Sequence, residues 1–224
     1  MTGGLVAVVP MRSLREGKAR LDGALEPAVR TALIRRMLLG VIGAINDSLA
    51  VDAVGVVSPD PAALELVLSL GPQVVPVAQS SAAPGLNPAL ERGRTWATER
   101  HAAGMLVLFG DLPLLSAPDI QHIVRRDAPV VISPDRHGTG TNAILLRSGD
   151  ESAAAEFRFL FGPGSYQRHV EEAHRLGLEV ATSITPGTAI DLDTPDDLRL
   201  LGIEPETGSL DHLETVRVLR GAAR

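Results

Sequence analysis

The sequence predicts an α/β protein with a mostly parallel sheet and helices on both faces of the sheet. Short, valine-rich apolar segments alternate along the chain with segments of helical periodicity. Several of these apolar segments, such as LVAVVP at 5–10, contain no polar residue, which is typical of strands covered on both faces. We therefore expect βαβ units joined by short loops.

The expected elements follow one another in regular order. Valine-, leucine- and isoleucine-rich runs place strands at 5–10, 51–58, 73–78, 105–111, 129–135, 142–147 and 178–184. Helical periodicity places helices at 27–46, 60–70, 87–103, 116–126, 165–177, 195–202 and 209–221. Four helix starts have capping signals, namely Asp60-Pro61, Asn87-Pro88, Thr194-Pro195 and the approximate capping box of Ser116 with Asp119.

The interval 129–147 breaks this alternation. Two strand-like runs flank the turn-rich DRHGTGT, and no room is left between them for a helix. We expect a local antiparallel excursion there. With 224 residues, the chain is expected to form one domain over 1–224, with 203–224 as a peripheral C-terminal segment and helix.

Composition narrows the function classes. The hydrophobic content of 45% and the mean hydropathy of +0.15 describe an ordinary globular protein. No apolar run is long enough to span a bilayer, and MTGGLVAVVPMR lacks the basic segment of a signal peptide. The absence of cysteine excludes disulfides and thiolate sites and fits a cytoplasmic protein. A net charge of −6 without a Lys/Arg-rich stripe argues against nucleic acid and favours a small-molecule partner.

A basic loop follows the first strand, where doubly wound sheets gather functional groups. It carries Arg12, Arg15, Lys18 and Arg20, and four cations suit a triphosphate. The loop has neither the P-loop pattern nor a GxGxxG fingerprint. A solvated basic loop is the alternative interpretation.

Acidic residues stand at two other strand ends. Asp111, in LFGDLP, ends an apolar strand and must be hydrogen-bonded, paired or bound to a metal such as Mg²⁺; a turn-capping aspartate is the alternative. In AIDLDTPDDL, Asp191 and Asp193 are expected to alternate on a short strand and to point to opposite sides. One of them could join Asp111 in holding one or two Mg²⁺ ions, whereas the helix macrodipole accounts for Asp196 and Asp197.

Three glycine-containing loops complete the candidate site. Gly85 could let the backbone close over a base or ribose, with Asn87 reading polar edges or capping the helix. HGTGTNAILLR at 137–147 offers glycines and threonine hydroxyls to an anion. FGPGS at 161–165 exposes backbone N–H groups where a helix begins, with Ser165 expected as its N-cap. Ordinary turns are the alternative for each loop.

Taken together, these motifs resemble the 2-phospho-L-lactate guanylyltransferases of coenzyme F-420 biosynthesis, whose bacterial branch uses phosphoenolpyruvate. The resemblance runs in order over 5–200 through KARL, GLNPAL, GDLP, DRHGTGTNAILL, FGPGS and DLDTPDDL. GDLP and DxDTPxDL are shared with many nucleotidyltransferases, whereas GTGTNA followed by FGPxS is much more specific. Arg12 stands where the family commonly has lysine, and the two side chains bind phosphate with different geometry.

The resemblance implies a Rossmann-like nucleotidyltransferase fold, a Mg²⁺ cofactor and a homodimer. It also implies transfer of GMP from GTP to the phosphate of a three-carbon phospho-acid, with release of pyrophosphate. An acceptor phosphate is already ionised at neutral pH, which agrees with the absence of a GxSxG nucleophile motif from the sequence. The acceptor stays open among phosphoenolpyruvate, 2-phospho-L-lactate and 3-phosphoglycerate.

The same resemblance implies roles for individual residues. Lys18, Arg20 and Asp111 would be catalytic, and the metal would be held by Asp111, Asp191 and Asp193. The nucleotide would be bound by Arg12, Lys18, Arg20, Gly85 and Asn87. Because the basic loop and the metal already serve the nucleotide's phosphates, the acceptor phosphate is assigned to Thr141, Gly162 and Ser165. The alternatives are a cytidylyl- or sugar-nucleotidyltransferase, a DxD glycosyltransferase and a non-catalytic nucleotide-binding domain.

Overall fold

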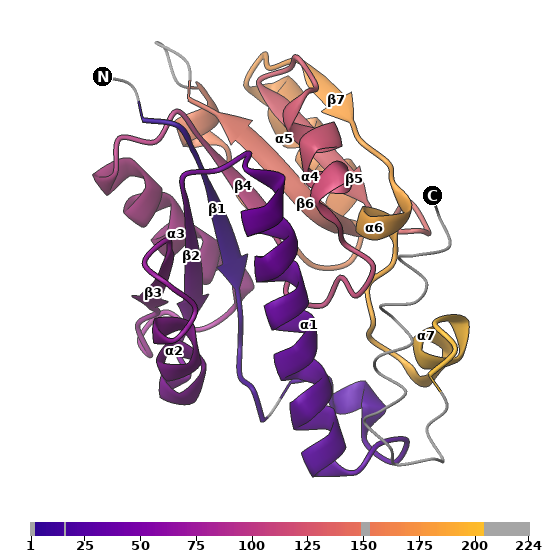
Figure 1. Cartoon of the computed structure of the whole chain (residues 1–224). Coiled ribbons are helices and arrows are strands. Elements are labelled where there is room, and N and C mark those ends of the chain that lie inside the picture. The colour runs from indigo at the N-terminus through magenta and orange to yellow at the C-terminus, as the bar shows by residue number, and fades with distance from the viewer. Residues whose placement is uncertain (1–2, 16, 149–152, 204–224) are drawn as a thin grey trace.

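The computed structural model describes residues 3–15, 17–148 and 153–203, and a seven-stranded sheet lies at its centre (Figure 1). The strands are β1 (Leu5–Pro10), β2 (Ala53–Ser58), β3 (Val74–Ala78), β4 (Gly104–Leu108), β5 (Val130–Pro134), β6 (Thr141–Arg147) and β7 (Val180–Thr182). Their order across the sheet is β3-β2-β1-β4-β6-β5-β7. Each strand overlaps a predicted one, so the expected α/β class is confirmed.

The antiparallel excursion is confirmed, and β6 is the reversed strand. It runs antiparallel to both β4 and β5, whereas the other strand pairs of the sheet are parallel. The turn between β5 and β6 is closed by the carboxylate of Asp135, which accepts hydrogen bonds from the backbone N–H groups of His137 (3.1 Å) and Thr139 (2.9 Å). So short a connection permits only an antiparallel neighbour.

The helices also follow the predicted order. They are α1 (Pro27–Ser48), α2 (Pro61–Leu68), α3 (Leu86–Glu99), α4 (Ala117–Val124), α5 (Ser165–Arg175), α6 (Pro186–Ala189) and α7 (Pro195–Leu200), with short 3-10 helices η1 (Ala19–Leu21) and η2 (Ala153–Glu156). The four-residue α6, which was not predicted, is too short to show helical periodicity. The helix predicted at 209–221 lies outside the described residues.

The capping signals are confirmed at three of the four helix starts. Asp60 caps α2 and Thr194 caps α7, and Ser116 forms a capping box with Asp119. The Asn87 prediction is wrong, because α3 begins at Leu86 and its cap residue is Gly85. The prediction of Ser165 as N-cap of α5 is also wrong. Gly164 takes that position in a left-handed conformation (φ 68°), which glycine adopts without steric cost.

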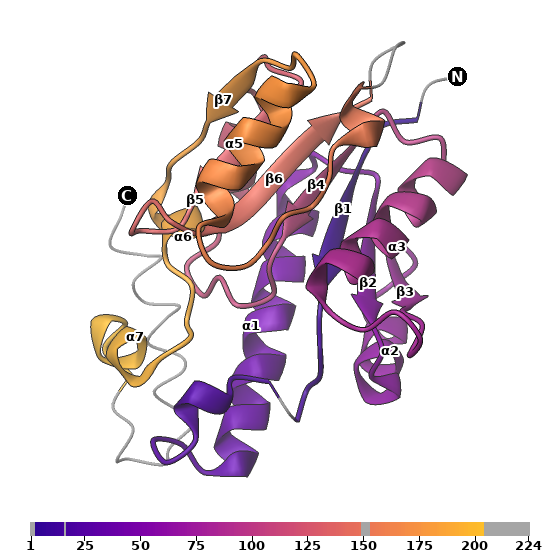
Figure 2. The same cartoon turned by 180° about the vertical axis from the view of Figure 1, so that it is seen from behind.

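The helices form two layers around the sheet, because alternate strand residues point to opposite faces. In β1, Ala7 and Val9 pack in the core beneath α1, α2 and α4 (Figure 1), whereas Val6 and Val8 pack beneath α3 and α5 (Figure 2). Burial of each such side chain contributes about 1–3 kcal/mol to folding. In the described part of the chain, no helix is long and apolar enough to cross a membrane.

A third apolar cluster fixes the loops at the carboxyl ends of the strands. Leu14 and Leu21, from the segment after β1, pack there with Leu33, Ile34 and Met37 of α1. Leu192 and residues of α7 complete the cluster. It anchors the basic loop and the DLD loop (residues 191–193) to the same helix, α1. The strand order reverses between β1 and β4, and α/β sheets bind ligands at such a switch point.

Candidate active site

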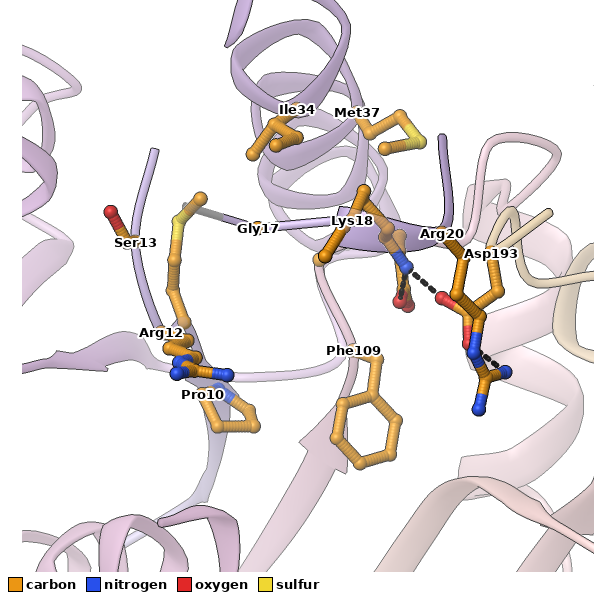
Figure 3. Close-up of a pocket in the computed structure, with 14 residues that line it drawn as sticks. Pro10, Arg12, Ser13, Gly17, Lys18, Arg20, Ile34, Met37, Phe109 and Asp193 are labelled. Carbon is orange, nitrogen blue, oxygen red and sulfur yellow. Dashed lines mark hydrogen bonds and ion pairs between the residues drawn. The ribbon is translucent and has the colours of Figure 1, made fainter. Parts of the chain in front are cut away.

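A pocket of about 370 Å³ opens beyond the carboxyl ends of β1 and β4 (Figure 3). One side is formed by the loop after β1, with Arg12, Lys18 and Arg20. Asp111 and Asp193 also line the pocket, with Asp193 beside Lys18 and Arg20, and Ile34 and Met37 of α1 supply an apolar wall. Tertiary structure therefore brings the basic loop and two aspartates from distant segments into one cavity.

Lys18 is the centre of this pocket. Its ammonium forms ion pairs with the carboxylates of both Asp111 and Asp193, and its side chain is only 12% exposed. Burial by itself lowers the pKa of Lys18, but the two carboxylates outweigh burial, so the pKa lies above its ordinary value. Its backbone is left-handed (φ 60°), a costly conformation for a residue with a side chain and one that concentrates at functional sites.

Asp60 positions the loop that presents these cations. One carboxylate oxygen caps α2, while the other accepts hydrogen bonds from the Ser13 hydroxyl (3.1 Å) and from the Leu14 backbone N–H (2.9 Å). Arg12 and Arg20 remain exposed, with the Arg20 guanidinium 4.0 Å from the Asp193 carboxylate. Both arginines are thus available to an anionic ligand in the pocket.

The segment containing Asp191 and Asp193 is not the short strand that was predicted. It is an irregular loop, held to the end of β4 by a hydrogen bond from the Leu192 N–H to the Asp111 carbonyl (3.1 Å). Both carboxylates lie near Asp111, because Lys18 pairs with both Asp111 and Asp193 and the charge of Asp111 acts on Asp191. Burial, and then the charge of Asp111, raise the pKa of Asp191.

Asp197 holds the DLD loop in place, a role that the sequence analysis assigned to no residue. Its buried carboxylate accepts hydrogen bonds from the backbone N–H groups of Asp193 (2.9 Å) and Thr194 (2.7 Å), and from Arg136 (2.6 Å). Burial by itself raises the pKa of Asp197. The hydrogen bonds lower this pKa by more than burial raises it, so the net pKa lies below its ordinary value. The capping-box spacing from Thr194 to Asp197 was the available signal.

The acidic side chains are not gathered into a complete metal site. Across 3–15, 17–148 and 153–203, no group of three or more His, Asp or Glu residues is arranged to hold a metal ion. The Lys18 ammonium already pairs with both Asp111 and Asp193. These oxygen donors still suit Mg²⁺, which usually takes one or two carboxylates and completes its coordination with water and substrate phosphates.

The two loops predicted to bind the acceptor lie against each other. The Tyr166 N–H, in the first turn of α5, donates a hydrogen bond to the Thr139 carbonyl (3.1 Å). The adjacent Asn142 side chain donates to the Thr188 carbonyl (3.0 Å) and to the Asp191 carboxylate (3.4 Å). The segment 139–142 therefore connects the α5 N-terminus with the acidic centre.

Arg168 is a second residue that the sequence analysis left without a role. Its guanidinium lies against Gly162, where a Cβ atom would come within 3.2 Å of Nη2. Both Nε and Nη2 are buried and have no hydrogen-bond partner in the described structure. Buried N–H groups without acceptors are unfavourable, and an anion bound beside Gly162 would provide acceptors for these two.

A second pocket of about 430 Å³ adjoins the first and shares Pro10, Met11 and Arg12 with it. Gly85 lines it with φ 107°, a conformation that favours glycine, and Gln79 lines it with its amide nitrogen donating to the carbonyls of Ala83 and Gly85 (both 2.8 Å). The carbonyl oxygen of Gln79 is therefore left to accept hydrogen bonds from a ligand. Sequence analysis gave no signal for Gln79.

Asn87, predicted to lie beside the nucleoside, makes its polar contacts with the protein backbone. Its amide pairs with the backbone of Phe161, accepting from the N–H at 3.0 Å and donating to the carbonyl at 3.4 Å. It does not line the second pocket. Asn87 thus ties the start of α3 to the FGPGS loop.

A pocket at the switch point that combines cations with carboxylates, with a second pocket beside it, is the arrangement expected of a nucleotidyltransferase. Comparison with known proteins agrees. The chain belongs to the guanylyl transferase CofC-like family, whose model matches residues 5–218. A curated relative from Rubrobacter xylanophilus, named phosphoenolpyruvate guanylyltransferase, is 41% identical over 87% of this chain and 92% of its own.

Solved structures share the fold. A Desulfovibrio desulfuricans protein assigned to the nucleotide-diphospho-sugar transferases has a TM-score of 0.75 at 20% identity, with coverage of 97% of this chain and 94% of its own. A Mycobacterium tuberculosis protein solved as a complex with manganese has a TM-score of 0.54 at 18% identity, with coverage of 92% and 100%. The expected Rossmann-like nucleotidyltransferase fold is confirmed.

Proposed function

We propose that this enzyme joins GMP from GTP to the phosphate of phosphoenolpyruvate, and that it does so with Mg²⁺. The observation that carries the proposal is the position of the 139–142 segment, which contacts α5 on one side and Asp191 on the other. An acceptor held there would face a nucleotide in the switch-point pocket. The curated relative named phosphoenolpyruvate guanylyltransferase supports phosphoenolpyruvate as the acceptor.

Lys18, Arg12 and Arg20 bind the triphosphate in this proposal. The repulsion between two polyanionic substrates is a main barrier to this reaction, and three cations that line one pocket offset it. As the leaving pyrophosphate gains charge, Lys18 and Arg20 remain beside it. The guanine and ribose lie in the second pocket, where Gln79 and Gly85 contact the nucleoside.

Asp111, Asp191 and Asp193 would hold the metal. Mg²⁺, when bound, would supply positive charge that withdraws electron density from the α-phosphorus. The manganese complex of a protein with the same fold supports divalent-metal use. Because Lys18 occupies two of these carboxylates, we expect it to turn toward the triphosphate as the nucleotide and metal enter.

The acceptor's phosphate is held by Thr141, Gly162, Ser165 and Arg168. One of its oxygens forms the new bond to the α-phosphorus of GTP, and the bond from that phosphorus to the bridging β-phosphate oxygen breaks. Pyrophosphate then leaves. The attacking oxygen is already ionised, so no side chain has to remove a proton, and the protein acts by positioning and charge neutralisation.

Purified enzyme with each nucleoside triphosphate, Mg²⁺ and each candidate acid tests this proposal. We expect pyrophosphate release with GTP and phosphoenolpyruvate, and a weaker rate with 2-phospho-L-lactate or 3-phosphoglycerate. Release with CTP and a sugar phosphate, but not with GTP, would overturn the proposal. Mass spectrometry of the product identifies which acid carries GMP.

A further inference from the structure

His169 joins the two acceptor-binding segments from inside the protein. It lies on α5 with no solvent exposure, and its ring packs against Phe157 and Phe161 at centroid distances of 5.8 Å and 4.6 Å. Nδ1 is 3.0 Å from the Thr141 hydroxyl oxygen, and Nε2 is 2.9 Å from the Leu160 backbone nitrogen. Both ring nitrogens are therefore engaged, and the aromatic contacts hold the plane of the ring.

The Leu160 contact determines which nitrogen carries the hydrogen. A backbone N–H can only donate, so Nε2 must accept and carries no hydrogen. The single hydrogen of the neutral ring then sits on Nδ1 and donates to the Thr141 oxygen. Burial, and secondarily the charge of Arg168, lower the pKa of His169 to about 4, which keeps the ring neutral near pH 7.

The Thr141 hydroxyl keeps its hydrogen available to donate. Its oxygen already accepts a hydrogen bond from His169, and its own hydroxyl hydrogen has no acceptor among the described residues. The residue is 4% exposed and begins β6, beside the loop that contacts α5. Because the oxygen already accepts from His169, the hydroxyl hydrogen is free to donate to whatever binds next to it.

We propose that His169 is a positioning residue that orients the Thr141 hydroxyl as a hydrogen-bond donor to the acceptor phosphate. The inference rests on the proposed function, in which Thr141 contacts the acceptor. His169 does not touch the substrate and acts through Thr141. Through Leu160 it also holds the segment leading into FGPGS, so both sides of the acceptor-binding region depend on one ring.

Three substitutions separate the two contacts of His169. His169→Phe keeps the aromatic shape and removes both hydrogen bonds. His169→Asn retains a donor near the Nδ1 position, whereas His169→Gln retains a polar group near the Nε2 position. We expect His169→Phe and His169→Gln to raise the KM for the phospho-acid about 10-fold, the value of one hydrogen bond to an anion. His169→Asn should stay within about 3-fold of wild type, with the KM for GTP unchanged in all three.

A double-mutant cycle with Thr141→Val tests whether His169 acts through the hydroxyl. If it does, His169→Phe adds less than about 2-fold in the Thr141→Val background. Equal effects of His169→Phe with and without the Thr141 hydroxyl would overturn the inference, as would a matching rise in the KM for GTP. His174→Phe, an exposed histidine on the same helix, is the matched control.

Nitrogen NMR of ¹⁵N-histidine-labelled wild-type enzyme tests the inference without any substrate. We expect the His169 ring to show the Nδ1–H tautomer near pH 7, with the ring signals assigned through their connection to the His169 backbone resonances. An Nε2–H tautomer would overturn the inference even if the variants fail to fold. Absence of turnover by the wild-type enzyme would refute the proposed function instead, and the tautomer would still be measurable.

Discussion

Lys18 pairs with Asp111 across 93 positions of sequence, and this contact joins the loop after β1 to the end of β4. The same ammonium pairs with Asp193. Lys18 therefore pairs with two carboxylates that a divalent cation would otherwise bind.

Lys18→Met should strengthen metal binding by the free enzyme while it impairs catalysis. Without the competing ammonium, Asp111 and Asp193 are free to bind a cation, so the affinity for Mn²⁺ without nucleotide should rise severalfold by isothermal titration calorimetry. Turnover should fall by about 100-fold or more, because the triphosphate loses a buried cation. Unchanged Mn²⁺ affinity would show that Lys18 does not compete with metal.

Asp111→Asn should abolish turnover and leave the fold intact. The substitution removes a charge that pairs with Lys18 and lies at the opening of the pocket, and we expect a loss of about 1,000-fold in kcat. Steady-state pyrophosphate release measures the loss, and circular dichroism checks the fold. Asp127→Asn, which makes the same charge change at an exposed site, should have wild-type activity. Full activity of Asp111→Asn would remove Asp111 from the proposed metal ligands.

Asp197→Asn should loosen the loop that carries Asp193. The amide cannot accept all the hydrogen bonds now made to the carboxylate, and we expect a loss of about 2 kcal/mol in the free energy of unfolding, with weaker metal binding. Urea denaturation measures the first and calorimetry the second. The neighbouring Asp196 is exposed, so Asp196→Asn should change neither by much. Equal effects at both positions would contradict this role for Asp197.

Arg168→Met should weaken acceptor binding selectively. Methionine keeps much of the apolar stem but removes the unpartnered guanidinium beside Gly162, so the KM for the phospho-acid should rise about 10-fold or more. The KM for GTP should not change. Arg36→Met, on the exposed side of α1, serves as the control. A larger change in the KM for GTP than in that for the acid would place Arg168 on the nucleotide side.

His169 should make the native state sensitive to mild acid. Its pKa falls to about 4 in the folded protein from an ordinary value near 6.5, so below pH 6.5 the unfolded chain binds a proton that the native state does not. Stability should therefore decline as pH falls from 6.5 toward 4, by on the order of 3 kcal/mol at most.

The measurement is the pH dependence of the free energy of unfolding for wild type and His169→Phe. Asp60, Glu172 and Asp197 have lowered pKa values, so their stabilising contributions are also lost in acid, and only the difference between the two proteins reports on His169. We expect the wild type to lose more stability than the variant over this range. Parallel curves would show that the ring is not held neutral.

Several features of the fold and site were predictable because their signals are local. The strand of 5–10 is apolar over its whole length, and Asp60 stands directly before the proline that starts α2, so neighbouring residues alone indicate both. The antiparallel β6 followed from a connection too short for a helix. Family motifs added the residues of the basic loop and of the acidic strand ends.

Only the tertiary structure decided how the polar groups pair. Asn87 was expected to cap a helix or contact a nucleoside, but it pairs with Phe161, 74 positions away. Asp197 was attributed to the helix macrodipole, and His169 was given no role, because a histidine or aspartate in a helical segment has the same local pattern whether it is solvated or buried against another loop. Periodicity in the sequence records which face of an element is apolar. Which distant donor meets which acceptor depends on how those faces pack, and that packing produced the pairing of Lys18 with Asp111.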